Sequence, residues 1–267
     1  MGIKKIYFAQ PWGGLGDNLG YSNLPRLFSQ KGIPFQVSVF NYSRNREIHD
    51  LVWNQNKFVL KKVSIRSPNA GYIMFNRRHI NNPEYNIIQT INVLHGFEPG
   101  NGYPEINIIN PNLHGKRIPS LADLNAFSLF NTQGLIYDKN YLDSLKLKLL
   151  KTGTKFLDFP NLYNEQGYLE DLVVVTSITD LISKLLSTDI FYCLNSGSHS
   201  LAATLKNSFG SPKKIVCFNP SSNIKNLKDW GYIFDNVEYE DIPSIKNSNP
   251  YLPIKIKTYK KILDYFS

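Results

Sequence analysis

A glycine-rich stretch near the start of the chain, residues 13–19, carries one carboxylate that could do chemistry. The stretch reads Gly-Gly-Leu-Gly-Asp-Asn-Leu and stands between a strand-like run, residues 5–9, and a helix expected over residues 20–30. Glycines at such a turn let a ligand approach the backbone closely. Asp17 would repel a phosphate, so its context favours a general base or a group that binds a hydroxyl. The alternative is a carboxylate that only caps a helix. The other site residues expected in this loop are Gly13, Gly14, Gly16 and Asn18.

A second candidate site, residues 195–200, reads Asn-Ser-Gly-Ser-His-Ser and follows a strand-like run, residues 190–194. A helix is expected directly after it, over residues 201–209. Backbone N–H groups at a helix start, together with small hydroxyl side chains, suit a phosphate or diphosphate. A capping role for Ser198 or Ser200 is expected in either case. The pattern therefore predicts an anion site with these members: Ser196, Gly197, Ser198, His199 and Ser200.

Two interpretations of His199 stay open. Its imidazole could contact phosphate and balance the charge of a leaving group, or it could be a surface histidine without a role. A nucleophilic serine in this loop is disfavoured, because no Gly-x-Ser-x-Gly turn surrounds any of the serines.

Weaker candidates for donor binding stand at the ends of other expected strands. For Ser177 the more ordinary role is the cap of a helix expected over residues 178–186, because Asp180 follows at capping-box spacing. The candidates are Asn125, Ser128, Thr176 and Ser177.

Strands and helices alternate in both halves of the chain, and a turn-rich stretch between them marks a boundary. Strand–helix–strand crossovers imply parallel sheets, so the fold class is α/β. Two such blocks predict two Rossmann-like domains that face a central cleft. We place one domain over residues 1–115, the second over residues 116–250, and a helical segment that packs back over residues 251–267.

Composition narrows the choice of partners and compartment. The 267 residues carry a net charge of +9. This charge could favour binding to a nucleic acid, an anionic membrane surface or a phosphorylated substrate. The basic residues are scattered, so nucleic acid is not expected. Cys193 and Cys217 stand in apolar runs and are expected to be buried free thiols, as in a reducing cytoplasm. The chain begins without an apolar signal core, which also favours a cytoplasmic protein.

The two loops together resemble those of glycosyltransferases of the GT-B type, and most closely the heptosyltransferase-like family that acts on lipopolysaccharide. Members carry Gly-Asp between a first strand and a helix, here Gly16-Asp17. They also carry Asp-Ser/Thr-Gly-x-x-His-Leu-Ala-Ala late in the chain, which here reads Asn-Ser-Gly-Ser-His-Ser-Leu-Ala-Ala over residues 195–203. Asn195 replaces the family's acid, and Ser200 stands where the family has histidine.

The resemblance implies a transferase that moves a sugar from a nucleotide-diphosphate donor to a hydroxyl of a glycan or lipid-linked acceptor. It implies inversion at the anomeric carbon without a metal or other cofactor, and the chain has no Asp-x-Asp motif. Asp17 would be the base, residues 196–200 would bind the diphosphate, and the first domain would hold the acceptor. The basic charge would also suit peripheral contact with an anionic membrane surface.

Two alternatives stay open at this point. A nucleotide-sugar epimerase of the same fold would need further acid–base residues beside the diphosphate. A non-catalytic binding protein with a decayed donor site would be compatible with the departures at Asn195 and Ser200.

Overall fold

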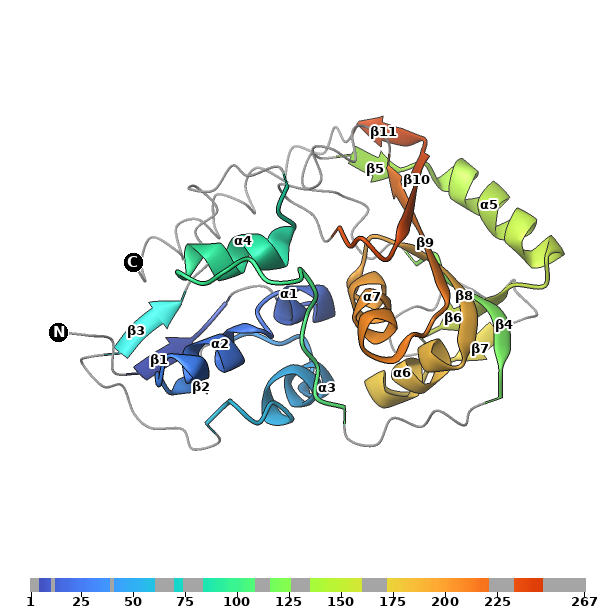
Figure 1. Cartoon of the computed structure of the whole chain (residues 1–267). Helices are drawn as coiled ribbons and strands as arrows, with labels where there is room; N and C mark the ends of the chain where they lie inside the picture. Colours follow the sequence, from blue (N-terminus) through green and yellow to red (C-terminus); the bar gives the residue numbers. More distant parts are fainter. Residues whose placement is uncertain are drawn as a thin grey trace.

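A computed structural model describes residues 5–10, 13–38, 41–60, 70–73, 84–108, 116–125, 135–159, 172–220 and 233–246 (Figure 1). Within these ranges strands and helices alternate and two parallel sheets form, which confirms the α/β class. Ser128 and the segment 251–267 lie outside the described residues. None of the described helices is both long enough and apolar enough to cross a membrane.

The first sheet has three parallel strands in the order β2-β1-β3. Its strands are β1 (Lys5–Phe8), β2 (Phe35–Val37) and β3 (Ala70–Ile73). Trp53 packs on Phe8 and Phe35 beside this sheet, with ring centroids 4.8 and 6.4 Å away. The helices of this half are α1 (Leu15–Leu19), α2 (Leu24–Gln30), α3 (Arg46–His49), the π-helix η1 (Asp50–Asn54) and α4 (Ile87–Leu94).

The second sheet has six parallel strands in the order β7-β6-β4-β8-β9-β10. Counted along the chain this is the order 3-2-1-4-5-6 of the Rossmann fold. Its strands are β4 (Ile118–Asp123), β6 (Lys155–Asp158), β7 (Leu172–Val174), β8 (Thr188–Leu194), β9 (Lys214–Pro220) and β10 (Glu238–Ile242). A small antiparallel pair joins β5 (Leu135–Tyr137) to β11 (Ser244–Lys246).

Helices cover both faces of the second sheet. Leu142, Leu145 and Leu149 of α5 (Lys139–Lys151) are buried in a cluster on one face. α6 (Ile178–Leu186) and α7 (Gly197–Phe209) contribute buried residues to a cluster on the opposite face. This second cluster continues into the first sheet, so α7 is packed between the two sheets (Figure 1).

The start of α7 differs from expectation. The helix begins at Gly197, four residues before the expected start at residue 201, so the serine loop forms its first turn. The N-cap is Ser196, whose side chain makes no capping hydrogen bond; the expected cap by Ser198 or Ser200 is therefore wrong. The starts of four other helices do have side-chain caps, from Asn45, Asn86, Asp138 and Ser177.

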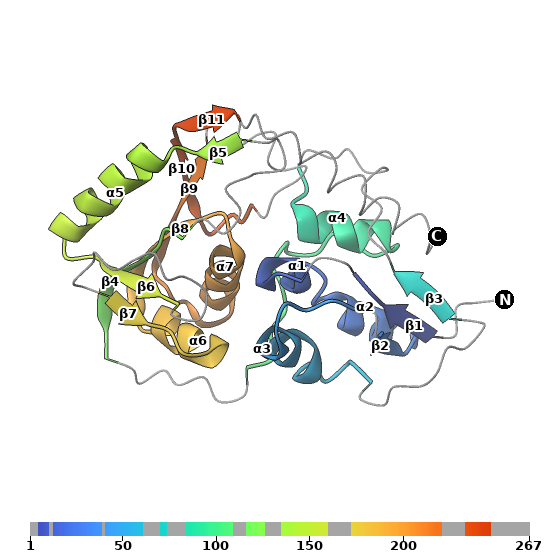
Figure 2. The same cartoon turned by 180° about the vertical axis from the view of Figure 1, so that it is seen from behind.

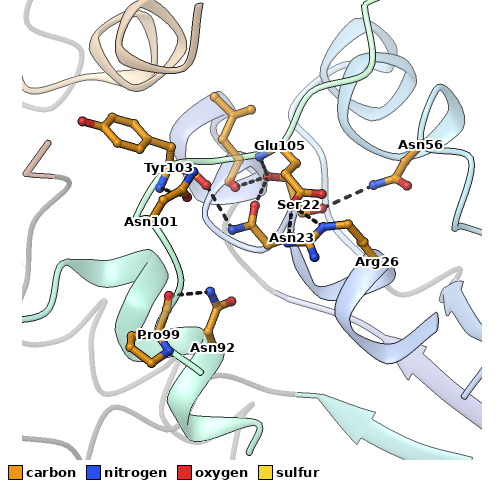
Figure 3. Close-up of polar contacts among 10 residues, drawn as sticks. Ser22, Asn23, Arg26, Asn56, Asn92, Pro99, Asn101, Tyr103 and Glu105 are labelled. Carbon is orange, nitrogen blue, oxygen red and sulfur yellow. Dashed lines mark hydrogen bonds and ion pairs between the residues drawn. The ribbon is translucent and has the colours of Figure 1, made fainter. Parts of the chain in front are cut away.

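A polar network ties residues 103–105 to α2 and to the two residues that precede it (Figure 3). Asn23 Nδ2 donates to the Tyr103 carbonyl at 3.0 Å, and the Glu105 N–H donates to Ser22 Oγ at 2.7 Å. Arg26 pairs with the Glu105 carboxylate at 2.5 Å. The expected domain boundary near residue 115 lies outside the described residues and stays a prediction.

Candidate functional site

Both candidate loops lie at the carboxyl ends of strands in parallel sheets. The glycine loop follows β1, which has β2 on one side and β3 on the other. The serine loop follows β8, which is paired to β4 at the point where the strand order reverses. In open α/β sheets this reversal opens the crevice in which ligands bind. The sequence therefore placed both loops at positions that favour binding.

The structure brings the two loops together. A Cβ built on Gly197 would lie 2.9 Å from Leu15 Cβ and 3.2 Å from the Gly16 nitrogen. A Cβ built on Gly16 would lie 3.5 Å from Ser200 Oγ. α1 and α7 are accordingly side by side in both views of the molecule (Figures 1 and 2). Only glycine at position 197 permits this approach without a shift of the backbone.

The glycine loop is held by the segment 41–44, which runs beside it. The Arg44 N–H donates to the Gly13 carbonyl at 2.8 Å, and the Tyr42 N–H donates to the Gln10 carbonyl at 3.1 Å. The ring of Tyr42 occupies the space that a side chain at position 13 would need, because a Cβ there would lie 2.3 Å from Tyr42 Cε1. Gly13 thus makes room for a side chain of the protein itself.

Asn18 has a structural place. Its side chain is fully buried and accepts hydrogen bonds from Trp53 Nε1 at 2.8 Å and Ser43 Oγ at 3.2 Å. Its Nδ2 donates to the Gly14 carbonyl at 2.9 Å. The amide therefore fastens the loop to η1 and to the segment 41–44.

Asp17 is half-buried and lies at the third position of α1. Its Oδ2 accepts a hydrogen bond from the Gly14 N–H at 3.0 Å, as in a capping box. The carboxylate and Arg44 Nη2 lie on the same side of Gly14, 2.7 and 3.9 Å from a Cβ built there. Asp17 thus has the capping role considered above; its role as a base stays a prediction.

The serine loop contains a chain of hydroxyl groups that ends on a carboxylate. Ser198 Oγ donates to Asp123 Oδ2 at 2.6 Å, and Ser196 Oγ lies 2.8 Å from Ser198 Oγ. A serine hydroxyl has one hydrogen, so with Asp123 ionised the donor in the second contact is Ser196. The hydroxyl hydrogens of Ser196 and Ser198 are thus used within the protein. The donors left for a ligand here are the backbone N–H groups in the first turn of α7.

His199 is fully buried between Phe234 and Tyr239, so the expectation of a surface histidine is wrong. Its Nε2 lies 3.0 Å from the Tyr239 hydroxyl, and its Nδ1 has no hydrogen-bond partner among the described residues. Burial lowers the pKa of His199 to about 3, so the ring is neutral near pH 7. It occupies the core below the loop.

Solved structures with the same arrangement of elements are glycosyltransferases. No protein-family model and no curated protein matches the sequence. The dodecameric iron-containing glycosyltransferase TibC of enterotoxigenic E. coli aligns with a TM-score of 0.61 and 14% identity. That alignment covers 90% of this chain and 64% of TibC. The glycosyl transferase family 9 protein of Veillonella parvula aligns with a TM-score of 0.56 and 10% identity, over 90% of this chain and 86% of that protein.

The chain therefore shares its fold with these glycosyltransferases. A second TibC structure, solved in complex with ADP-D-β-D-heptose, aligns with a TM-score of 0.58 and 13% identity, over 90% of this chain and 63% of TibC. The chain thus spans slightly less than two thirds of TibC. Within the described residues no group of three or more His, Cys, Asp or Glu side chains could hold a metal ion.

Two of the weaker candidates lie away from the serine loop. Thr176 and Ser177 follow β7, which β6 and β4 separate from β8. Ser177 Oγ accepts from the Asp180 N–H at 3.0 Å and so caps α6, as expected. Glu47 Oε2 accepts from the Ile178 N–H at 2.9 Å, so a carboxylate of the protein already occupies the start of α6.

Asn125 does lie close to the serine loop, through Asp123. Its N–H donates to Asp123 Oδ1 at 3.2 Å, and its Nδ2 donates to the Leu157 carbonyl at 3.3 Å. Burial raises the pKa of the Asp123 carboxyl, and the hydrogen bonds from Ser198 and Asn125 oppose that rise.

Sequence reasoning missed Asp123, whose carboxylate accepts a hydrogen bond from Ser198 of the serine loop. The signal that could have found it is a polar residue at the end of an apolar strand, where parallel sheets bind ligands. Asn219 at the end of β9 carries the same signal. Asn195, where the family has an acid, is half-buried at the end of β8.

Proposed function

We propose that this chain is a glycosyltransferase that moves a sugar from a nucleotide-diphosphate donor to a hydroxyl acceptor. The observation that carries the proposal is the contact between the starts of α1 and α7, at Gly16 and Gly197. It sets a loop with one carboxylate beside a helix start whose side-chain cap is missing. The alignments with glycosyltransferases, one of them solved with ADP-D-β-D-heptose, support this choice of chemistry.

In the proposed reaction, the acceptor lies on the side of the first sheet and the donor on the side of the second. Asp17 takes the proton of the acceptor hydroxyl while that oxygen attacks the anomeric carbon. The new C–O bond forms as the bond to the diphosphate breaks, and the electron pair leaves with the diphosphate. Attack from the face opposite the leaving group inverts the anomeric centre. No metal takes part in the proposed steps.

The start of α7 stabilises the leaving diphosphate. The first backbone N–H groups of a helix have no intrahelical partner, and the helix dipole adds positive potential at that end. Because the hydroxyl of Ser198 is directed to Asp123, we assign the main contacts to the N–H groups of Gly197, Ser198 and His199. A cytoplasmic protein that acts on glycan or lipid-linked acceptors at an anionic membrane surface would suit the net charge of +9.

A donor screen tests the proposed function. The wild-type protein is incubated with nucleotide-diphosphate sugars and a mixture of glycan and lipid-linked acceptors, and products are identified by mass spectrometry. Thermal shifts with UDP, GDP, ADP and CMP are measured in parallel. Transfer of a sugar, with a rise in melting temperature for a nucleoside diphosphate, is the expected result. A shift without transfer would support a non-catalytic binding protein, and a changed sugar without an acceptor would support an epimerase.

A further inference from the structure

Asn219, one residue before the end of β9, has a buried amide group whose nitrogen lacks a hydrogen-bond partner among the described residues. Its relative exposure is 1%, and its Nδ2 has no hydrogen-bond partner among the described residues. Buried polar groups in folded proteins are almost always hydrogen-bonded, and one that is not often marks a functional site. The two N–H bonds of this amide therefore call for an acceptor that the described residues do not supply.

The thiol of Cys217 lies on the oxygen side of the Asn219 amide. Cys217 Sγ lies 4.0 Å from Asn219 Oδ1, and a thiol can donate weakly to a carbonyl oxygen. This contact directs Nδ2 away from Cys217. The two side chains are on the same face of β9, because residues two apart in a strand share a face. Cys217 belongs to the hydrophobic cluster that includes α7, so Asn219 is on the α7 face of the sheet.

Strand register places Asn219 near the start of α7. Leu194, the last residue of β8, pairs with Phe218 of β9, and Asn195 and Asn219 directly follow these two residues in the chain. Ser196, the N-cap of α7, follows Asn195 directly. On its other side Asn219 pairs with Asp241 of β10, whose side chain is exposed.

Two sets of hydrogen-bond donors thus meet at one edge of the sheet. One set is the first-turn N–H groups of α7, a helix of 13 residues whose N-cap side chain makes no capping hydrogen bond. The other is the amide of Asn219. Neutral donors that converge at the positive end of a helix are suited to an oxyanion.

We infer that Asn219 Nδ2 donates to a phosphate oxygen of a nucleoside diphosphate bound at the start of α7, and so sets the affinity for the donor's diphosphate. This inference rests on the proposed function and adds a recognition residue to it. Asn219 holds no reacting atom, and no bond is made or broken at it. Its contact is to the diphosphate and is the same for every nucleotide base.

Two variants of Asn219 test the inference through binding and stability together. Dissociation constants for ADP, GDP and UDP are measured by calorimetry, and melting temperatures are measured without ligand. Asn219→Leu should weaken all three nucleotides about tenfold or more, because it removes a hydrogen bond to a charged group. It should also keep or raise the melting temperature, because a buried amide without a partner is replaced by an apolar side chain. Asn219→Asp should weaken binding further by placing a carboxylate beside the phosphate.

The matched control is Asn92→Asp, which buries a new carboxylate in α4, outside the serine loop. It should lower the melting temperature and leave all three affinities unchanged. If the wild type binds and the Asn219 variants bind within about twofold of it, the inference is overturned while the proposed function stands. A loss confined to one nucleotide would also overturn it. If the wild type binds none of the three, the proposed function fails and the inference fails with it.

Discussion

His199 shows how the core holds a titratable ring neutral. The imidazole packs against Phe234 and Tyr239 and is fully buried. Transfer of a charged imidazolium into such surroundings is costly, so burial lowers the pKa of His199 to about 3 from an ordinary value of 6.5. The neutral ring therefore belongs to the folded state, whereas the unfolded chain takes up a proton below its ordinary pKa.

This difference predicts an acid-sensitive fold. Because the unfolded state binds the proton first, the free energy of unfolding should fall as pH drops from about 6.5 toward 3, by about 1.4 kcal/mol per pH unit. His199→Phe should remove this contribution to the pH dependence. Between about pH 6.5 and pH 5, the free energy of urea unfolding of the wild type should therefore fall by roughly 2 kcal/mol more than that of the variant. Half-buried His95, whose pKa is also lowered by desolvation, remains in both proteins. Equal slopes would contradict the account.

Residue types alone could not separate ligand contacts from internal ones. Asn18 looked like part of a binding loop, and only the fold shows that Trp53 and Ser43 already use its side-chain oxygen. The role of His199 depends on Tyr239, a partner 40 residues away. Asp17 directly follows the glycines of residues 13–16, a local feature that predicts a site residue; its role as a base stays a prediction.

At the scale of elements, the contact between α1 and α7 depends on two glycines that tolerate change differently. A Cβ on Gly197 would come within 2.9 Å of Leu15 Cβ and 3.2 Å of the Gly16 nitrogen. A Cβ on Gly16 would find its nearest neighbours at 3.5 Å and beyond, which is ordinary van der Waals contact. The contact can therefore accept an added methyl group at Gly16 but not at Gly197.

We predict opposite effects for the two alanine substitutions. Gly197→Ala should lower the free energy of unfolding by about 1–3 kcal/mol, because the methyl group overpacks the contact. Gly16→Ala should leave it unchanged or raise it by up to about 1 kcal/mol, through better helix propensity. Urea unfolding of both variants beside the wild type measures this. Equal effects of the two changes would show that α1 and α7 do not meet in this way.

Sequence patterns located most elements and misplaced the start of one. The capping of α6 by Ser177 followed from Ser and Asp three residues apart. The start of α7 was placed four residues late, because serines and glycine are read as loop when no partner is visible. Asp123, 75 residues from Ser198, supplies the partner that lets the serine loop join the helix.

At the scale of the whole molecule, Tyr103 links the two halves of the chain. Asn23, the residue before α2, donates to the Tyr103 carbonyl at 3.0 Å, and the Tyr103 hydroxyl accepts from the Asn236 N–H at 3.1 Å. Its ring stacks on Phe234 with centroids 5.7 Å apart. Phe234 in turn contacts His199. A continuous path of contacts thus runs from α2 to the core under the start of α7.

We expect Tyr103→Phe to loosen this link without breaking it. The ring and its stacking remain, but the Asn236 N–H loses its acceptor, which should cost about 1 kcal/mol. Hydrogen exchange at the Asn236 amide should become faster by about fivefold, with little change at amides of α5. Tyr141→Phe on the exposed side of α5 is the control and should change neither. Unaltered exchange at Asn236 would argue against the link.

The sequence predicted the α/β class and the two blocks of alternating elements, since periodicity and turn residues are local. It could not supply the Rossmann order of the second sheet, because Asp123 of β4 and Cys193 of β8 pair across 70 residues of chain. Nor could it predict that Glu47 of the first block would cap α6 of the second. Such pairings arise only when distant segments pack.

The role of Asp17 tests the account most directly. With the donor that the screen identifies, turnover and donor affinity are measured for Asp17→Asn, whose side-chain oxygen can still accept from the Gly14 N–H. Asp138→Asn, at the start of α5, is the matched control, because Asp138 also accepts from helix N–H groups. The account predicts unchanged donor affinity and a turnover lowered about 100-fold or more for Asp17→Asn, with no change in the control. Wild-type turnover in Asp17→Asn would contradict it.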